Sequence, residues 1–156
     1  MLNNKVLIRR AEPADALAIV DFNRRMAFET EGKELPLETI SAGVAAIFAD
    51  ANGQKGFYLV AETDLKETVG CLLVTFEWSD WRGGWFWWMQ SVYVREDFRG
   101  AGVYRRMYDW AKTEARERGG VRGFRLYVER ENAVAQTVYE RLGMSETVYK
   151  MYEEII

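Results

Sequence analysis

The chain has 156 residues, a formal net charge of −3 and a hydrophobic content of 49%. This length fits one domain, 1–156, with enough apolar residues for a sizeable core. The acidic balance argues against a general nucleic-acid binder. No apolar run approaches the ~20 residues that span a membrane, and the opening segment MLNNKVLIRR lacks the apolar region of a signal peptide. We therefore expect a cytoplasmic protein with no membrane partner.

The sequence contains no histidine and one cysteine, Cys71. Histidine-dependent nucleophilic catalysis is therefore excluded. The commonest transition-metal ligand is also missing, so we expect no metal site. Cys71 lies in the apolar run VGCLLVTF and is expected to be a small core residue. Any chemistry must use carboxylates, tyrosine, backbone groups or a bound cofactor.

Hydrophobic periodicity and turn residues predict a mixed α+β chain. In chain order we expect a strand at 5–11, helices at 12–30 and 37–50, strands at 57–62, 68–78 and 85–94, a helix at 102–118, a strand at 124–129, a helix from 132 to 143 and a closing strand at 144–156. The segment SDWRGG predicts a hairpin turn. Asn132 is expected to cap its helix, and Gly143 to follow its end.

The segment EDFRGAGVYRRMYDW, Glu96–Trp110, places two glycines just before a helix. A strand, a glycine-bearing turn and a helix N-terminus form a phosphate-binding arrangement. The Walker A and dinucleotide patterns are not met, since Arg105 fills the third glycine position of the latter. Seven arginines between 99 and 125 suit one anionic ligand. The alternatives are a plain helix-start turn and a solvated basic face.

A second segment, Tyr127–Met144, places Asn132, Ala135 and Tyr139 on one face of the predicted helix. Such a face, ending in a tyrosine hydroxyl, suits the lining of a pocket. The alternative is that Asn132 only caps the helix and Tyr139 only packs.

Together, VYVREDFRGAGVYRRM and NAVAQTVYERLGM resemble the GNAT superfamily of acetyl-CoA-dependent N-acetyltransferases. Arg99 and Gly102 match the family pattern, whereas Tyr104 stands where a small residue is expected. The resemblance implies one GNAT-like acyl-CoA N-acyltransferase domain over 1–156, class α+β. Its central sheet would be mixed, mostly antiparallel, of about six to seven strands flanked by four helices.

The resemblance also implies roles for particular residues. The strand edge at Val92, Tyr93 and Val94 would bind the pantetheine arm, the backbone of Arg99, Gly100, Ala101, Gly102, Val103 and Tyr104 would hold the pyrophosphate, Asn132 would contact pantetheine or phosphate, and Tyr139 would face the sulfur. Independently of the family, Arg99, Arg105 and Arg130 are suitable partners for the 3′-phosphate of CoA.

Acetyl transfer to an amine requires a base, because with a pKa near ~10.4 only about one alkyl amine in 10³ is neutral at pH 7. Without histidine the base is a carboxylate or a water chain. We predict Glu77 as the catalytic base and the Tyr139 hydroxyl as the group that stabilises the leaving thiolate. Glu29 and Glu31 are predicted to border the acceptor site, as the resemblance implies. The alternative for each glutamate is a solvated surface group.

The stretch EWSDWRGGWFWWMQ holds five of the six tryptophans. In a strand, Trp88 and Gln90 share one face. We predict that this face lines the acceptor pocket, where an indole binds an ammonium by cation–π attraction. The alternatives are a core strand buried on both faces and a dimer interface.

The sequence therefore predicts an N-acetyltransferase that uses acetyl-CoA as co-substrate. It would transfer the acetyl group directly to a small cationic primary amine in a ternary complex. Three alternatives stay open: acetylation of a protein lysine or N-terminus, a non-catalytic CoA-binding module, and a domain that binds another nucleotide or none. The sequence leaves a homodimer open as well.

Overall fold

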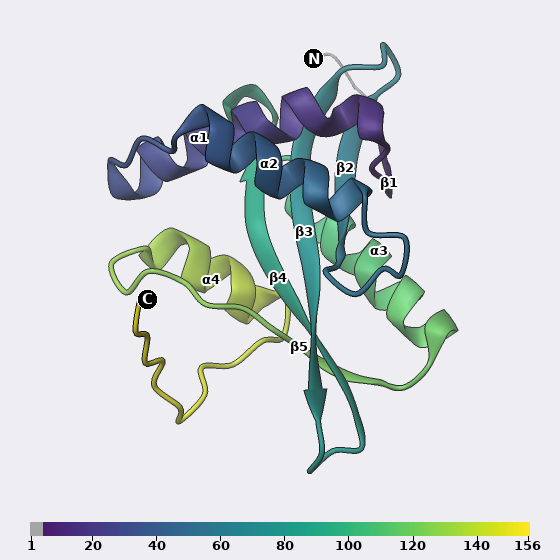
Figure 1. Ribbon diagram of the computed structural model, residues 1–156, viewed down its shortest axis with the longest axis vertical. Helices are drawn as coiled ribbons and strands as arrows, with labels where there is room; N and C mark the ends of the chain where they lie inside the picture. The colour runs from purple at the N-terminus through teal and green to yellow at the C-terminus, as the bar shows by residue number, and fades with distance from the viewer. Residues whose placement is uncertain (1–4) are drawn as a thin grey trace. The chain divides into compact units, whose positions relative to one another are not determined.

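The computed structural model describes residues 5–156. The chain forms two compact units, of which the first ends at Leu126 and the second spans Tyr127–Ile156. Figure 1 traces the chain from β1 to the C-terminus. Within its described part, the first unit contains a β-sheet and three α-helices, and the second unit contains the helix α4 (Ala133–Arg141).

The elements of the first unit follow the predicted order. Its strands are β1 (Val6–Arg10), β2 (Phe57–Thr63), β3 (Thr68–Ser79), β4 (Gly84–Val94) and β5 (Val121–Arg125). Its helices are α1 (Ala16–Glu31), α2 (Leu37–Phe48) and α3 (Val103–Arg118), and short 3₁₀ turns at Pro13–Asp15 and Glu96–Phe98 precede α1 and α3.

The five strands lie in the sheet in chain order. The pairs from β1 to β4 are antiparallel, and β5 joins β4 in parallel. This last pair is parallel because α3 carries the chain back along the sheet between the two strands. The β3–β4 hairpin turns between Ser79 and Gly84, where the SDWRGG segment predicts it. The mixed, mostly antiparallel sheet is confirmed.

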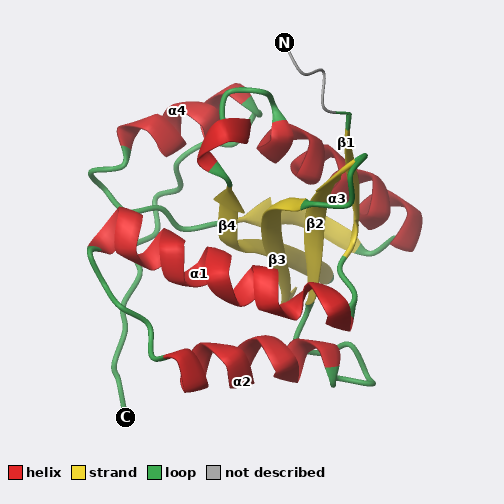
Figure 2. Ribbon diagram, turned by 90° about the horizontal axis from the view of Figure 1, so that it is seen from above, coloured by secondary structure: helices red, strands yellow, loops and turns green. Residues whose placement is uncertain are grey.

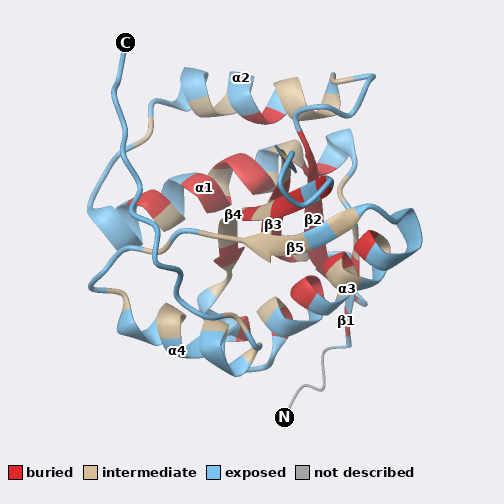
Figure 3. Cartoon of the chain, turned by 90° about the horizontal axis from the view of Figure 1, so that it is seen from below, coloured by how far each residue is buried: buried red, intermediate tan, exposed pale blue. Residues whose placement is uncertain are grey.

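Helices cover both faces of this sheet. Figure 2 shows α1 and α2 on one face and α3 on the other. The core of the α1–α2 face consists of Ile19, Val20, Phe22, Val44, Tyr58, Val60, Cys71 and Tyr93. On the α3 face, the buried ring of Trp87 lies 5.5 Å from that of Phe57 and 6.2 Å from that of Phe124, centroid to centroid. The buried residues of Figure 3 follow the inner sides of the helices and the central strands.

Cys71 is fully buried in this core, as predicted. Burial raises the pKa of its thiol to about 12. The thiol therefore stays protonated, and it is a poor nucleophile. Of the helices in residues 5–156, none has the length and apolarity that crossing a bilayer requires.

One predicted strand has different bounds, and another is wrong. We expected a strand at 124–129, but β5 begins at Val121, because Gly119 and Gly120 take φ angles of 72° and 73° and turn the chain directly after α3. We also expected a closing strand at 144–156, but these residues, all of them described, form no helix or strand. An alternating pattern becomes a strand only where a neighbour supplies hydrogen bonds. Over residues 5–156, the sheet therefore has five strands rather than about six to seven.

Within the second unit, the predicted ends of the last helix are confirmed. The side-chain oxygen of Asn132 accepts a hydrogen bond of 3.1 Å from the backbone amide of Ala135. This is the geometry of an N-cap. Gly143 follows the helix with a φ of 89°. Helices commonly end with a residue of positive φ, and glycine adopts such a φ most readily.

Candidate active site

The loop from Arg99 to Tyr104, called the glycine loop below, carries the chain from β4 into α3. Gly100 and Gly102 both take a φ of 74°. A Cβ atom on either one would meet nothing within 4 Å, so the backbone conformation rather than crowding requires glycine there. Gly102 is the N-cap of α3, and no side chain caps the helix. The first amides of α3 have no partner within the helix and favour an anion in front of them.

The side chain of Arg99 connects the glycine loop to β4 and to α1. Its Nε donates to the carbonyl oxygen of Val94 at 2.8 Å, and its terminal nitrogen forms a 2.7 Å ion pair with Glu29 at the end of α1. Glu29 also accepts a 3.3 Å hydrogen bond from the hydroxyl of Tyr93. Burial, followed by the negative charge of Glu29, raises the pKa of Tyr93, so this hydroxyl stays a donor. The structure thus brings together Glu29, Tyr93 and Arg99, three of the predicted site residues.

Two of these residues, Glu29 and Tyr93, line a hollow in the first unit. It has a volume of about 520 Å³ and is lined by Arg25, Glu29, Tyr93, Arg95, Glu96 and Asp97. Glu31, the other glutamate predicted for the acceptor site, pairs instead with the exposed Lys33. The two glutamates therefore have different surroundings although they are two residues apart.

The side chains of Tyr104 and Arg105 extend along α3. The ring of Tyr104 stacks on Tyr108, with centroids 6.3 Å apart and planes at 24°. The large residue at this position thus packs along its own helix. Arg105 is exposed and lies 3.8 Å from Asp109.

β4 contains a bulge between Gln90 and Tyr93. On β3, Cys71 and Leu73 are two residues apart, but their partners Tyr93 and Gln90 are three apart. Ser91 takes a φ of 48°, which is uncommon for a residue other than glycine, and so absorbs the extra residue. The strand bends at the bulge, just before Val92, Tyr93 and Val94, the edge predicted to bind pantetheine.

The two parallel strands pair over only part of their length. The parallel register of β4 with β5 runs from Trp85↔Val121 to Trp88↔Arg125 and ends there. Within the described part of the first unit, no strand pairs with this edge of β4 from Met89 to Val94. An open edge presents backbone N–H and C=O groups that can bind an extended ligand as an added strand. This open edge leads from the glycine loop to Trp88 and Arg125.

Glu77 lies near the end of the open edge at which β4 pairs with β5, the closed end. It faces the same side of the sheet as Cys71 and Leu73, the α1–α2 side, because residues two apart on a strand share a face. One carboxylate oxygen of Glu77 accepts a 3.2 Å hydrogen bond from the indole nitrogen of Trp88, and the other pairs with the guanidinium of Arg125. The structure thus brings together Glu77 and Trp88, two of the predicted site residues, and adds Arg125.

Two further contacts complete this cluster. The guanidinium of Arg125 lies over the ring of Phe86, 3.8 Å from its centroid, and that of Arg82 lies 5.8 Å from the same centroid. The amide nitrogen of Gln90 donates a 2.6 Å hydrogen bond to the hydroxyl of Thr75 on β3. Gln90 thus has a protein partner for its amide nitrogen.

The other candidate residues belong to the second unit. The side-chain oxygen of Asn132 caps α4, as described above. Burial raises the pKa of Tyr139, so its hydroxyl remains protonated to a higher pH than an ordinary tyrosine.

The arginines of residues 99–125 do not gather into the single anion-binding site that the sequence suggests. Arg99 pairs with Glu29, Arg106 donates to the carbonyl of Val6, Arg118 lies over the ring of Phe76, Arg122 donates to backbone carbonyls of the β3–β4 hairpin, and Arg125 pairs with Glu77. Neighbours in sequence are separated in space because they occupy a loop, different sides of a helix and alternate faces of a strand.

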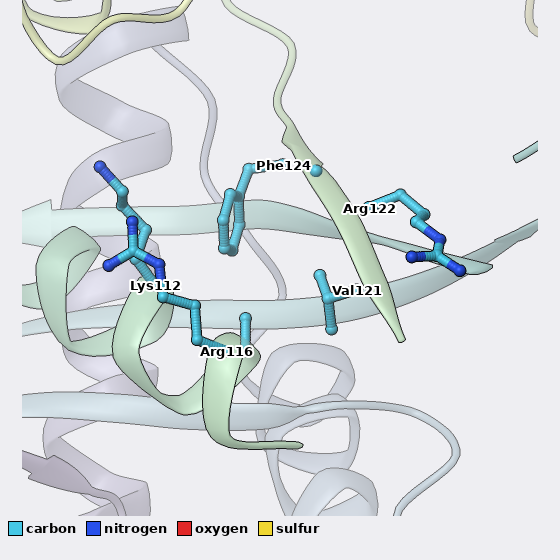
Figure 4. A pocket seen from close by; sticks show the side chains of 7 residues that line it. Lys112, Arg116, Val121, Arg122 and Phe124 are labelled. Atoms are coloured by element: carbon cyan, nitrogen blue, oxygen red, sulfur yellow. The ribbon is translucent and has the colours of Figure 1, made fainter. Parts of the chain in front are cut away.

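A smaller hollow lies on the opposite side of the sheet from Glu77. It has a volume of about 170 Å³ and lies between α3 and β5. In Figure 4, Lys112 and Arg116 lie at one side of it, the ring of Phe124 lines it, and Arg122 points away. It therefore offers two cations without a carboxylate among its lining residues.

Comparison with known proteins places this geometry in a family. The sequence pattern of the Acetyltransferase (GNAT) family matches residues 18–144. No curated protein matches the chain significantly. A possible acetyltransferase from Clostridium difficile 630 is 40% identical, with 97% of each chain covered and a TM-score of 0.88.

Two more distant structures share the fold. A predicted acetyltransferase with acetyl-CoA from Clostridium acetobutylicum is 18% identical, with 96% of each chain covered and a TM-score of 0.77. Glucosamine-6-phosphate N-acetyltransferase from Arabidopsis thaliana is 19% identical, with 97% of this chain and 99% of that chain covered and a TM-score of 0.73. The chain therefore belongs to the GNAT family of acetyltransferases, with the GNAT fold and as an acyltransferase enzyme.

Proposed function

We propose that the protein transfers the acetyl group of acetyl-CoA to the primary amine of a small molecule, by direct transfer in a ternary complex. The observation that carries this proposal is the open edge of β4. It begins beside the uncapped N-terminus of α3 and ends at the cluster of Glu77, Trp88 and Arg125. The open edge of β4 thus connects a candidate anion site, at the N-terminus of α3, to the carboxylate of Glu77.

The described residues fit acetyl-CoA along this path. The amides of the glycine loop suit a pyrophosphate, and the edge at Val92, Tyr93 and Val94 suits the amide-bearing pantetheine arm. Arg105 is exposed and within one helical turn of the loop, which suits a 3′-phosphate partner. Arg99 can serve the same phosphate once Glu29 releases it. By family resemblance, we also assign Asn132 to pantetheine or phosphate and Arg130 to the 3′-phosphate.

Bound acetyl-CoA supplies an activated acetyl thioester. Glu77 accepts the proton of the substrate ammonium, directly or through water, so that the neutral amine can attack. The hydrogen bond from Trp88 holds this carboxylate in one orientation, and Arg125 pairs with it before the substrate binds. A backbone N–H near Val92 polarises the thioester carbonyl.

The leaving thiolate needs a hydrogen-bond donor. We assign this role to Tyr139, by family resemblance and because its raised pKa keeps the hydroxyl protonated. A phenol that donates a hydrogen bond to a developing thiolate stabilises the transition state more than the ground state.

The acceptor is proposed to lie over Trp88 and Gln90. Trp88 is partly exposed and offers an aromatic surface beside Glu77, which suits an ammonium. For Glu29, the pairing with Arg99 favours the cofactor end of the site. The placement of Glu31 beside the acceptor stays a prediction.

The test is CoA release with a panel of small primary amines, with the acetylated product identified by mass spectrometry. We expect amine-dependent release with one product molecule per CoA. Release only with lysine-bearing or N-terminal peptides would assign a protein acceptor instead. Acetyl-CoA binding without release, for any amine or peptide, would indicate a non-catalytic CoA-binding module.

A further inference from the structure

The ion pair of Glu77 and Arg125 spans three strands. Glu77 lies on β3 opposite Phe86 of β4, and Arg125 lies on β5 opposite Trp88 of β4. The two charged side chains therefore meet across β4, over the ring of Phe86. This is the point at which β4 and β5 separate.

The pair is accessible from solvent. The Arg125 side chain is 33% exposed and that of Glu77 is 39% exposed. A half-exposed pair of this kind contributes little to folding stability, because water screens its attraction. Its position, at the closed end of the open edge, suits recognition of a small molecule.

The charge balance of this cluster is positive. Two guanidinium groups, those of Arg82 and Arg125, lie at the ring of Phe86, whereas Glu77 is the carboxylate bonded there. A substrate with two or more positive charges would place one of them against an arginine. A substrate that carries one ammonium and one anionic group would meet an opposite charge at each end.

We infer that the acceptor is a primary amine with an anionic substituent, a carboxylate or a phosphate, and that Arg125 determines this specificity. The ammonium binds Glu77 and the anionic group binds Arg125. Before binding, Glu77 and Arg125 neutralise each other, and afterwards each has a partner of opposite charge in the substrate. One ion pair is exchanged for two, and no charge is left unpaired. This inference rests on the proposed function.

The experiment uses pairs of amines that differ in the anionic group alone. They are γ-aminobutyrate with its carboxamide, and phosphoethanolamine with ethanolamine, and a diamine of similar length is measured beside them. We expect kcat/KM to be at least about tenfold higher for the anionic member of one pair or both. The pair that responds tells a carboxylate from a phosphate substituent.

Variants locate the effect at Arg125. In Arg125→Gln the preference for the anionic member should fall to about twofold or less, mainly through a higher KM, and Arg125→Lys should keep part of it. Arg116→Gln also removes one positive charge, but from the smaller hollow between α3 and β5, and it should leave the preference unchanged. A double variant, Glu77→Gln with Arg125→Gln, removes the pair without leaving an unpaired charge, and its far-ultraviolet circular dichroism reports whether the sheet is intact.

The outcomes separate this inference from the function on which it rests. Binding of acetyl-CoA together with faster acetylation of the neutral or dicationic amines overturns the inference alone. An anionic preference that survives in Arg125→Gln also overturns it. Failure of the protein to bind acetyl-CoA at all overturns the proposed function, and the inference with it.

Discussion

Arg99 of the glycine loop and Glu29 of α1 form a 2.7 Å ion pair. It joins the candidate phosphate site to the end of the first helix. Glu29 also holds the hydroxyl of Tyr93, so the contact is part of a three-residue cluster. The carboxylate of Glu29 thus pairs with the guanidinium that we propose as a partner for a phosphate of CoA.

This relationship predicts that Glu29→Gln strengthens acetyl-CoA binding. Removal of the carboxylate frees Arg99 and also removes a negative charge near the phosphates. Because both side chains are partly exposed, the effect is modest, and we expect the Kd to fall about two- to fivefold. Isothermal titration calorimetry at low salt measures it. Glu31→Gln is the control, since Glu31 pairs with Lys33. If the Kd of Glu29→Gln is unchanged or higher, Arg99 does not bind the phosphate.

Gly102 predicts an effect on both stability and binding. Its φ of 74° is costly for alanine, although a Cβ would meet nothing within 4 Å. The Gly102→Ala variant should lose about 1 kcal/mol of unfolding free energy and bind acetyl-CoA less tightly. The matched control is Gly43→Ala inside α2, an open position without a positive φ, which should gain about 0.5–1 kcal/mol. Urea denaturation measures both changes in unfolding free energy. If both variants were stabilised, or both destabilised, the account of the loop would be contradicted.

Tyr139→Phe tests the proposed proton donor. We expect kcat to fall by about 10²-fold with little change in the Kd of acetyl-CoA, because the hydroxyl acts on the leaving thiolate. Since burial raises the pKa of Tyr139, its ionisation should not lower kcat below about pH 10. Tyr149→Phe, an exposed tyrosine of the same unit, is the control. Full turnover by Tyr139→Phe would remove this residue from the mechanism.

The cluster of Arg9, Asp15 and Glu62 predicts acid sensitivity. Arg9 pairs with Asp15 at 2.8 Å and with Glu62 at 2.6 Å. Burial acts to raise the pKa of Asp15, but hydrogen bonds from Arg9 and from the Glu12 amide outweigh it and lower the pKa. The hydrogen bond from Arg9 is the main cause of the lowered pKa of Glu62.

A lowered folded-state pKa means that the stabilisation is present above the ordinary carboxylate pKa. It is lost as the pH falls through the lowered value. Asp15→Asn should therefore cost about 3 kcal/mol at pH 7 and should make stability less dependent on pH below about pH 4. Denaturation at pH 7 and pH 3 measures this. Glu114→Gln, which breaks the exposed pair with Arg10, should change stability by less than about 0.5 kcal/mol. Equal effects of the two variants would contradict the account.

Local signals in the sequence predicted most of the fold. The hairpin at Ser79–Gly84, the start of α3 after Gly102 and the Asn132 cap each depend on residues within a few positions, and each is confirmed. The closing strand at 144–156 was wrong because its partner cannot be read from its own alternation. β5 begins at Val121, three residues before the expected start, because the chain turns at Gly119 and Gly120. The hydrophobic pattern predicts only a loop over these residues.

The candidate site could be predicted only in part, for the same reason. The glycine loop and the Glu77 position follow from motifs and strand ends. The pairing of Glu77 with Arg125 joins residues 48 positions apart and depends on the parallel register of β4 and β5. One arginine in an otherwise alternating strand, FRLYVE, was the available signal, and it was grouped with the nearby arginines instead.

The most direct test of the account is calorimetric titration of the protein with acetyl-CoA, and with dephospho-CoA, ATP and NAD as competitors for the same loop. The account predicts one acetyl-CoA per chain, weaker binding of dephospho-CoA, and a melting temperature that rises with acetyl-CoA. At 100 times the Kd the stabilisation should be about 2.7 kcal/mol. No binding of acetyl-CoA at millimolar concentration, or equal binding of ATP and NAD, would contradict the assignment of the glycine loop and the open edge of β4.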